Sequence, residues 1–241
     1  MKPIAIFRHA KTEGPGYFAT FLDQHSIPWQ LIAIDQGEAV PERADAYSGL
    51  CLMGGPMSVN DPLPWITQMC ALIREADRED IPVIGHCLGG QLMSKAFGGV
   101  ISASPTKEIG WGTARVENND GSRRWLGDDR DEFGVVTVFQ WHGETFSLPS
   151  GAQRILTNEY CANQMFTLGP HLAMQCHVEM SPEMINAWCA CWAAEVHDLD
   201  PLPMSVQTPE RMRSEAEARL PPMRRLADRL YSVWLRNVQR I

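Results

Sequence analysis

One short stretch, residues 81–97, constrains the fold more than any other, because it predicts a strand, a tight turn and a helix in succession. It begins with apolar residues, runs through Gly-His-Cys-Leu-Gly from Gly85 to Gly89, and then takes the apolar spacing of a helix. Glycines two residues before and after Cys87 let the backbone turn sharply. The pattern Gly-x-Cys-x-Gly is typical of a nucleophile elbow, whose central side chain projects at the carboxyl edge of a sheet.

The backbone amides that open the predicted helix would point at the sulfur of Cys87. Together with the positive end of the helix dipole, such amides stabilise a thiolate and then the oxyanion of an acyl-transfer intermediate. The alternative interpretation of Cys87 is a small buried apolar residue, since most free cysteines have that role. The spacing alone does not decide between the two.

The bulk composition narrows the class of protein. With 241 residues, of which 44% are hydrophobic, we predict a single domain over residues 1–241. No apolar run is long enough to span a membrane, and Arg8 follows the first apolar residues too early for a secretory signal. Seven irregularly spaced cysteines predict reduced thiols in a cytoplasmic protein. The net charge of −8 argues against nucleic acid as the main partner.

The C-terminal segment, residues 201–241, carries a net charge of +4 against −12 for the remainder. We predict that this segment is a helical extension that packs on the acidic body. Its last predicted helix places an apolar stripe on one face: Met223, Leu226, Leu230, Val233 and Trp234.

Short apolar segments that alternate with helical segments predict an α/β fold. The first buried-strand candidates are residues 4–7, 31–34 and 49–53, and a helix is predicted to begin at Asp61-Pro62. Near-continuous apolar strands of this kind predict a doubly wound, mostly parallel sheet with helices on both faces.

The middle of the chain predicts further strands, part of which we expect to form an antiparallel flap on the main sheet. They lie at residues 111–116 and 135–139 around a polar turn at 118–124, around Ile155 and Met165, and at 172–179. Two to three helices are predicted to close the chain.

A thiol with the ordinary pKa of about 8.5 is mostly protonated at neutral pH, so a nucleophilic Cys87 needs a base and an orienting acid. The best pair is His177 and Glu179, because residues two apart in an extended segment project to the same side. Glu179 would then hold His177 in one tautomer while the other nitrogen faces Cys87. The alternative is a structural histidine beside a helix-capping acid.

Several motifs together resemble the class I glutamine amidotransferases, and in particular the free-standing members similar to the glutaminase domain of GMP synthase. They occur in the family's order over roughly residues 1–195, which is more specific than any one motif. The matching segments are residues 54–56, which resemble an oxyanion loop, and residues 85–91, 108–111, 141–144 and 175–179.

This resemblance implies a flavodoxin-like class I glutamine amidotransferase fold and a cysteine-dependent amide hydrolase. Cys87 would attack the side-chain amide of glutamine, His177 would act as base and then acid, and Glu179 would orient it. The backbone N–H groups of Gly55 and Leu88 would form the oxyanion hole. A glutamyl thioester would form, ammonia would leave, and water would release glutamate.

The resemblance also implies what the protein binds. The substrate would be glutamine or a γ-glutamyl compound, and an ammonia-accepting synthetase subunit would be the protein partner. No cofactor, metal, nucleic acid or membrane is expected. The amino-acid end of the substrate would be held by Gln91, Trp141, His142, Gly143 and Glu144.

Three residues depart from the family's pattern. His86 stands before the nucleophile where the family has an aliphatic residue, and Cys176 and Val178 flank the histidine where Phe and Pro are usual. These differences leave the shape of the pocket and the thiol pKa open. On elbow geometry, we expect the side chain of His86 to point away from the nucleophile.

Four alternatives remain. A self-sufficient γ-glutamyl peptide hydrolase would use the same chemistry, and a non-catalytic subunit would keep the same residues in a poor geometry. An α/β-hydrolase of the dienelactone hydrolase type also has a Gly-x-Cys-x-Gly elbow, but its acid precedes its histidine by a long stretch of chain. A metal site is opposed by the absence of a zinc-type spacing among Cys176, His177, Cys189 and Cys191.

Overall fold

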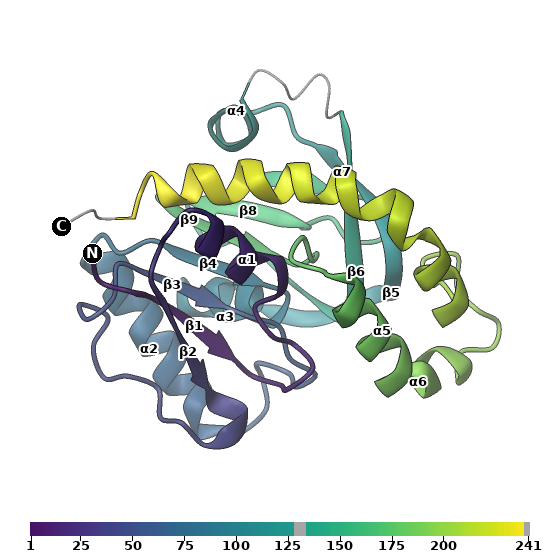
Figure 1. Ribbon diagram of the computed structural model, residues 1–241, viewed down its shortest axis with the longest axis horizontal. Coiled ribbons are helices and arrows are strands. Elements are labelled where there is room, and N and C mark those ends of the chain that lie inside the picture. Colours follow the sequence, from purple (N-terminus) through teal and green to yellow (C-terminus); the bar gives the residue numbers. More distant parts are fainter. Residues whose placement is uncertain (128–133, 239–241) are drawn as a thin grey trace.

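The computed structural model describes residues 1–127 and 134–238, and a nine-strand sheet runs through its centre. The strand order is β2-β1-β3-β4-β9-β8-β7-β5-β6. The pairings from β2 to β9 are parallel, and those from β9 to β6 are antiparallel. The α/β class expected from the sequence is confirmed, with a mixed sheet (Figure 1).

The parallel half consists of short, buried strands. They are β1 (Ile4–Arg8), β2 (Trp29–Ala33), β3 (Gly49–Leu52), β4 (Val83–His86) and β9 (His171–Met174). Alternate side chains of β1 point into two different hydrophobic cores. Ile4 and Ile6 belong to one core, and Ala5 and Phe7 belong to the other. Because both faces are covered, these strands read as continuous apolar runs in the sequence.

Helices pack on both faces of this half. The core that contains Ile6 includes side chains of α1 (Gly16–Gln24), α5 (Pro182–Cys191) and α7 (Pro209–Leu235). The core that contains Phe7 includes those of α2 (Pro64–Arg78) and α3 (Leu88–Ala96). The short helices are η1 (Ile34–Gln36), α4 (Asp120–Leu126) and α6 (Ala193–His197). No helix among the described residues combines the length and hydrophobicity needed to cross a bilayer.

The antiparallel half is larger than a flap. Its two longest strands, β5 (Ile101–Val116) and β6 (Val135–Phe146), pair along most of their length. Two shorter strands, β7 (Gln153–Thr157) and β8 (Met165–Leu168), connect this pair to β9. In Figure 1, β5 and β6 lie beside α5, with α7 crossing them.

Three predicted boundaries were wrong. The second long helix begins at Pro64 rather than at Asp61, because the Asp61 carboxylate instead accepts a hydrogen bond from the Ser58 N–H (3.0 Å) in the preceding turn. Most of the predicted polar turn is instead the helix α4, which Asn119 caps by accepting from the Ser122 N–H (3.0 Å). The last strand ends at Met174 rather than at residue 179.

The predicted apolar stripe on α7 is buried at all five positions. The ring of Trp234 occupies the space that a side chain at Gly49 would need, 2.8 Å from an ideal Cβ there. We expect Trp234→Ala to lower the free energy of unfolding by about 3–5 kcal/mol, because it leaves a large cavity in the core.

Urea denaturation of the variant measures this loss, with Met204→Ala as the control because Met204 is 94% exposed. An unchanged unfolding midpoint together with an altered oligomeric state would contradict the prediction, and would mark the helix as a partner surface.

Candidate active site

Cys87 lies at the turn between β4 and α3 and has φ of +49° and ψ of −106°. A positive φ is rare for a residue with a side chain and is retained where the surrounding structure enforces it. The turn is tight, because a Cβ at Gly85 would lie 2.5 Å from the Gly89 backbone, and one at Gly89 would collide with the Leu52 carbonyl. This geometry is that of a nucleophile elbow.

His177 and Glu179 lie on the segment that follows β9. His177 Nδ1 donates to Glu179 Oε1 at 2.6 Å, and both side chains are buried. The other carboxylate oxygen of Glu179 accepts from the Val178 N–H at 2.9 Å. Two backbone hydrogen bonds, of 2.8 and 3.0 Å, join His177 to Phe139 of β6. The pair is therefore held by both halves of the sheet.

Electrostatics favours an ionised acid and a basic imidazole in this pair. Burial alone would raise the pKa of Glu179, but the charge of His177 and its hydrogen bond lower it to about 2. Burial alone would lower the pKa of His177, but the charge of Glu179 raises it well above its ordinary value, and the nearby Cys87 adds to this. His177 Nε2 is buried and has no hydrogen-bond partner among the described residues. That nitrogen is available to exchange a proton.

A cavity of about 370 Å³ opens beside Cys87. The residues predicted from the sequence gather in its wall: Cys87, Gly55, Gln91, Trp141, His142, Gly143 and Glu144. Leu88 lies next to the predicted oxyanion loop, residues 54–56, because a Cβ at Gly55 would lie 2.8 Å from the Leu88 side chain. The Leu88 N–H is the first of α3, so it has no acceptor within that helix. His177 and Glu179 are buried and are not in the cavity wall.

Gln175 was missed as a site residue, although it lies in a segment that the sequence singles out. Its amide Nε2 is 3.5 Å from the Cys87 sulfur, and its Oε1 accepts from Gln91 Nε2 at 3.2 Å. Gln91 Nε2 also lies 3.4 Å from the Glu144 carbonyl oxygen. The two glutamines thus connect the nucleophile to the strand predicted to hold the amino-acid end of the substrate.

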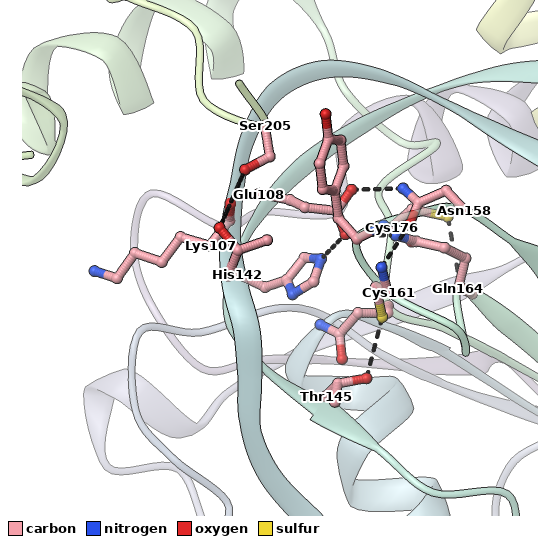
Figure 2. A network of polar contacts seen from close by, with 12 residues as sticks. Lys107, Glu108, His142, Thr145, Asn158, Cys161, Gln164, Cys176 and Ser205 are labelled. Atoms are coloured by element: carbon pink, nitrogen blue, oxygen red, sulfur yellow. Dashed lines mark hydrogen bonds and ion pairs between the residues drawn. The ribbon is translucent and has the colours of Figure 1, made fainter. Parts of the chain in front are cut away.

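A buried polar network holds the predicted substrate residue His142 (Figure 2). Its Nδ1 donates to the Glu144 carbonyl oxygen at 3.0 Å, and its Nε2 lies 3.1 Å from Glu108 Oε2. Glu108 also accepts from Asn158 at 2.5 Å and from Gln164 at 2.8 Å. The ring of His142 is therefore fixed on two sides.

The same network contains the one group of possible metal donors found among residues 1–127 and 134–238, namely Glu108, His142 and Cys161. Each of these donors already has hydrogen-bonding partners, and Thr145 lies 3.1 Å from the Cys161 sulfur. Burial raises the pKa of Cys161, which keeps the thiol protonated and makes it a poor ligand. The alternative metal set that includes Cys176 and Cys189 is not gathered in one place.

Other cavity residues gave no signal in the sequence, because distant segments bring them in. Trp188 and Trp192 form an aromatic wall with Trp141, and the Trp188 ring stands edge-on to His177 at 4.9 Å between centroids. At the rim, Lys107 pairs with Glu195 at 2.7 Å. Glu13, from the segment between β1 and α1, also lines the cavity.

Glu13 is 5% exposed, and burial raises the pKa of its carboxyl from 4.5 to about 7, with His177 opposing and Glu179 adding to the effect. Because the unfolded chain loses this proton at lower pH than the folded one, the folded state loses stability as pH rises from 4.5 to 7. The loss reaches about 3 kcal/mol above pH 7.

We therefore expect Glu13→Gln to raise the melting temperature at pH 8 and to leave it nearly unchanged at pH 4.5. Thermal unfolding followed by circular dichroism at the two pH values measures the difference. Equal effects of the substitution at both pH values would contradict the assignment of this raised pKa to Glu13.

His86 does not line the cavity. Its Nε2 lies 3.1 Å from the Tyr231 hydroxyl of α7 and 3.8 Å from Glu179 Oε2, and its Nδ1 is 3.9 Å from the Cys51 sulfur. Burial lowers the pKa of His86, although the charge of Glu179 opposes this. His86 therefore contacts both Glu179 and Tyr231 of α7, and it links the proposed catalytic acid to that helix.

Comparison with known proteins agrees with this geometry. The class I glutamine amidotransferase family matches residues 24–187. A solved structure of a glutamine amidotransferase from Methylobacillus flagellatus is 40% identical, with a TM-score of 0.95 over 100% of this chain and 97% of that one. The glutamine amidotransferase-like protein YfeJ of Salmonella typhimurium is 30% identical over 187 residues, 74% of this chain and 76% of its own. Gamma-glutamyl peptidase 3 of Arabidopsis thaliana is 26% identical over 182 residues, 73% of each chain.

The chain therefore belongs to the class I glutamine amidotransferase family. The family expected from the sequence is confirmed. The alternative of an α/β-hydrolase of the dienelactone hydrolase type loses its support. The family match includes the elbow at Cys87 and the segment with His177 and Glu179, and the similar solved structure covers the whole chain.

Proposed function

We propose that this protein hydrolyses the side-chain amide of glutamine, with Cys87 as nucleophile. The main support is that Cys87, strained at its elbow, lies next to His177 of the buried His177–Glu179 pair, whose hydrogen bond is 2.6 Å long. The adjoining cavity of about 370 Å³ suits a single amino acid.

Each step of the reaction has a residue to carry it. The Cys87 thiol passes its proton to His177, the sulfur attacks the amide carbon, and the N–H groups of Gly55 and Leu88 bind the oxygen as it becomes negative. The carbon–nitrogen bond breaks as His177 donates a proton to the nitrogen, which leaves as ammonia. Water then attacks the thioester while His177 takes its proton, and glutamate and the free thiol are released. Glu179 orients the imidazole throughout.

A second candidate is hydrolysis of γ-glutamyl peptides without any partner. It is favoured by the similarity to gamma-glutamyl peptidase 3 over 73% of each chain. The two candidates share every chemical step and differ only in the amine that leaves. In the glutaminase case, an ammonia-accepting synthetase subunit is the proposed partner, because the released ammonia needs an acceptor.

The experiment that tests the proposal is a panel of γ-glutamyl amides, glutamine included, assayed with the purified protein for glutamate release. We expect weak but measurable hydrolysis of glutamine, since in amidotransferases the binding of a partner can stabilise the active conformation of the oxyanion loop. Negligible turnover of glutamine with rapid turnover of a γ-glutamyl peptide would favour the second candidate. No turnover of any member would reject both.

A further inference from the structure

Glu13 places a second carboxyl group beside the proposed catalytic residues. It lines the same cavity as Cys87. An added Cβ at Gly54 would collide with Glu13 Oε2 and would lie 3.3 Å from His177 Cε1. The carboxyl group therefore lies against the oxyanion loop, on the side where the loop approaches His177. A glycine at position 54 is what leaves room for it.

The segment that carries Glu13 is fixed to the catalytic segment. The Trp188 indole N–H donates to the Thr12 carbonyl oxygen at 2.8 Å, one residue before Glu13. The Tyr17 N–H donates to the Glu179 carbonyl oxygen at 2.8 Å, four residues after it. The distance from this carboxyl to the His177–Glu179 pair is therefore set by the fold and not by a free loop.

The Glu13 carboxyl group lacks the partners that usually accompany buried acids. No residue in ranges 1–127 and 134–238 donates a hydrogen bond to it, and no cation there forms an ion pair with it. The lysine in the cavity wall, Lys107, is paired with Glu195. A buried acid without partners costs stability, so its position in a cavity wall points to a role toward the ligand.

The proposed reaction defines which end of the substrate meets Glu13. The glutamyl end is assigned to Gln91 and residues 141–144, on the β6 side of Cys87. The leaving nitrogen must face His177, because it takes its proton there. Glu13 lies beside His177, so it faces the leaving amine.

We propose that Glu13 is a specificity-determining residue that disfavours γ-glutamyl substrates whose leaving amine carries a carboxylate, as γ-glutamyl peptides do, in favour of ammonia and uncharged amines. This inference rests on the proposed hydrolysis of γ-glutamyl amides at Cys87. Its physical basis is repulsion between two carboxylates in a buried, weakly screened site.

The repulsion depends on the ionisation of Glu13, whose pKa is about 7. Below that pH the carboxyl is neutral and repels nothing, and above it the charge is fully present. His177 and Glu179, on the segment after β9, act directly on the Glu13 carboxyl. The other charged and titratable groups in the cavity wall are Lys107, His142, Glu144 and Glu195, together with the Cys87 thiol. The discrimination between substrates should therefore grow as pH rises through about 7.

The test compares kcat/KM for three substrates at pH 5.5 and 8.5: glutamine, γ-glutamylglycine and γ-glutamyl ethylamide. For the wild-type protein, the preference for glutamine over γ-glutamylglycine should rise about tenfold between the two pH values. In Glu13→Gln this preference should be low and equal at both. The preference over the uncharged ethylamide should not change with pH or with the substitution.

Two further variants keep the test decisive. Glu13→Asp retains a carboxyl group and should retain the pH-dependent preference, even if its overall rate falls. Glu42→Gln removes an exposed acid outside the cavity wall and should behave as the wild type. Ratios of two substrates on one variant are unaffected by partial misfolding.

A preference that is independent of pH and unchanged in Glu13→Gln would overturn this inference while leaving the proposed function intact. So would equal responses of γ-glutamylglycine and the ethylamide, because they would indicate selection by size. Absence of turnover with all three substrates would instead reject the proposed function itself.

Discussion

Cys87→Ser should lower glutamate release from glutamine by at least about a thousandfold, because a hydroxyl is a far weaker nucleophile than a thiolate in a site arranged for sulfur. The elbow geometry and the neighbouring His177 remain in this variant, so only the attacking atom changes. Steady-state assay of glutamate formation measures the effect.

Cys191→Ser is the matched control, because Cys191 is the one exposed thiol among seven unpaired cysteines and does not line the cavity. It should keep wild-type activity. Activity that survives in Cys87→Ser and falls in Cys191→Ser would place the nucleophile outside the elbow.

His177→Ala should lower kcat by about 10²–10⁴-fold, since general acid–base catalysis contributes that much, and Glu179→Gln should have a smaller effect. In the proposed mechanism Glu179 orients the imidazole without transferring the proton, and with a pKa of about 2 it stays ionised across the assay range. In His177→Ala, the residual rate should increase as pH approaches the ordinary thiol pKa of about 8.5, because hydroxide then generates the thiolate. Rates from pH 6 to 9.5 measure both effects.

If both variants kept normal turnover, the base would have to lie elsewhere. His142 would be the next candidate, because it is the histidine among the described cavity residues. His86 would not, because its ring is directed to Tyr231 and Glu179. His142→Ala then becomes the variant that decides between the two sites.

The elbow and its partner pair could be predicted from sequence because their signals are local. Gly85 and Gly89 allow the tight turn predicted around Cys87, and the structure adds a positive φ at Cys87 itself. The two-residue spacing of His177 and Glu179 correctly indicated side chains on one side, although the strand itself ends at Met174. An isolated backbone pairing with Phe139 keeps the segment extended where the strand has ended.

Other residues of the cavity wall could not be predicted from the sequence, because only tertiary contacts bring them to the site. Three strands, β2, β3 and β4, lie between Glu13 and Cys87 in the sequence. The proposed role of Glu13 also depends on the space beside Gly54. In the sequence, Trp188 and Trp192 have the pattern of apolar residues of a helix, yet in the structure they form part of the cavity wall. The start of α2 was misplaced because Asp61-Pro62 is a locally plausible helix start, whereas the chain uses Asp61 in the preceding turn.

Cys87 is proposed as the nucleophile toward the side-chain amide of glutamine. The most direct test is alkylation by a glutamine analogue that carries a chloroketone in place of the amide, followed by peptide mapping by mass spectrometry. We predict one label per chain, on Cys87, with loss of glutaminase activity in proportion to labelling and protection by glutamine. Labelling spread over Cys51, Cys176 and Cys189, or full activity after Cys87 is labelled, would contradict the account.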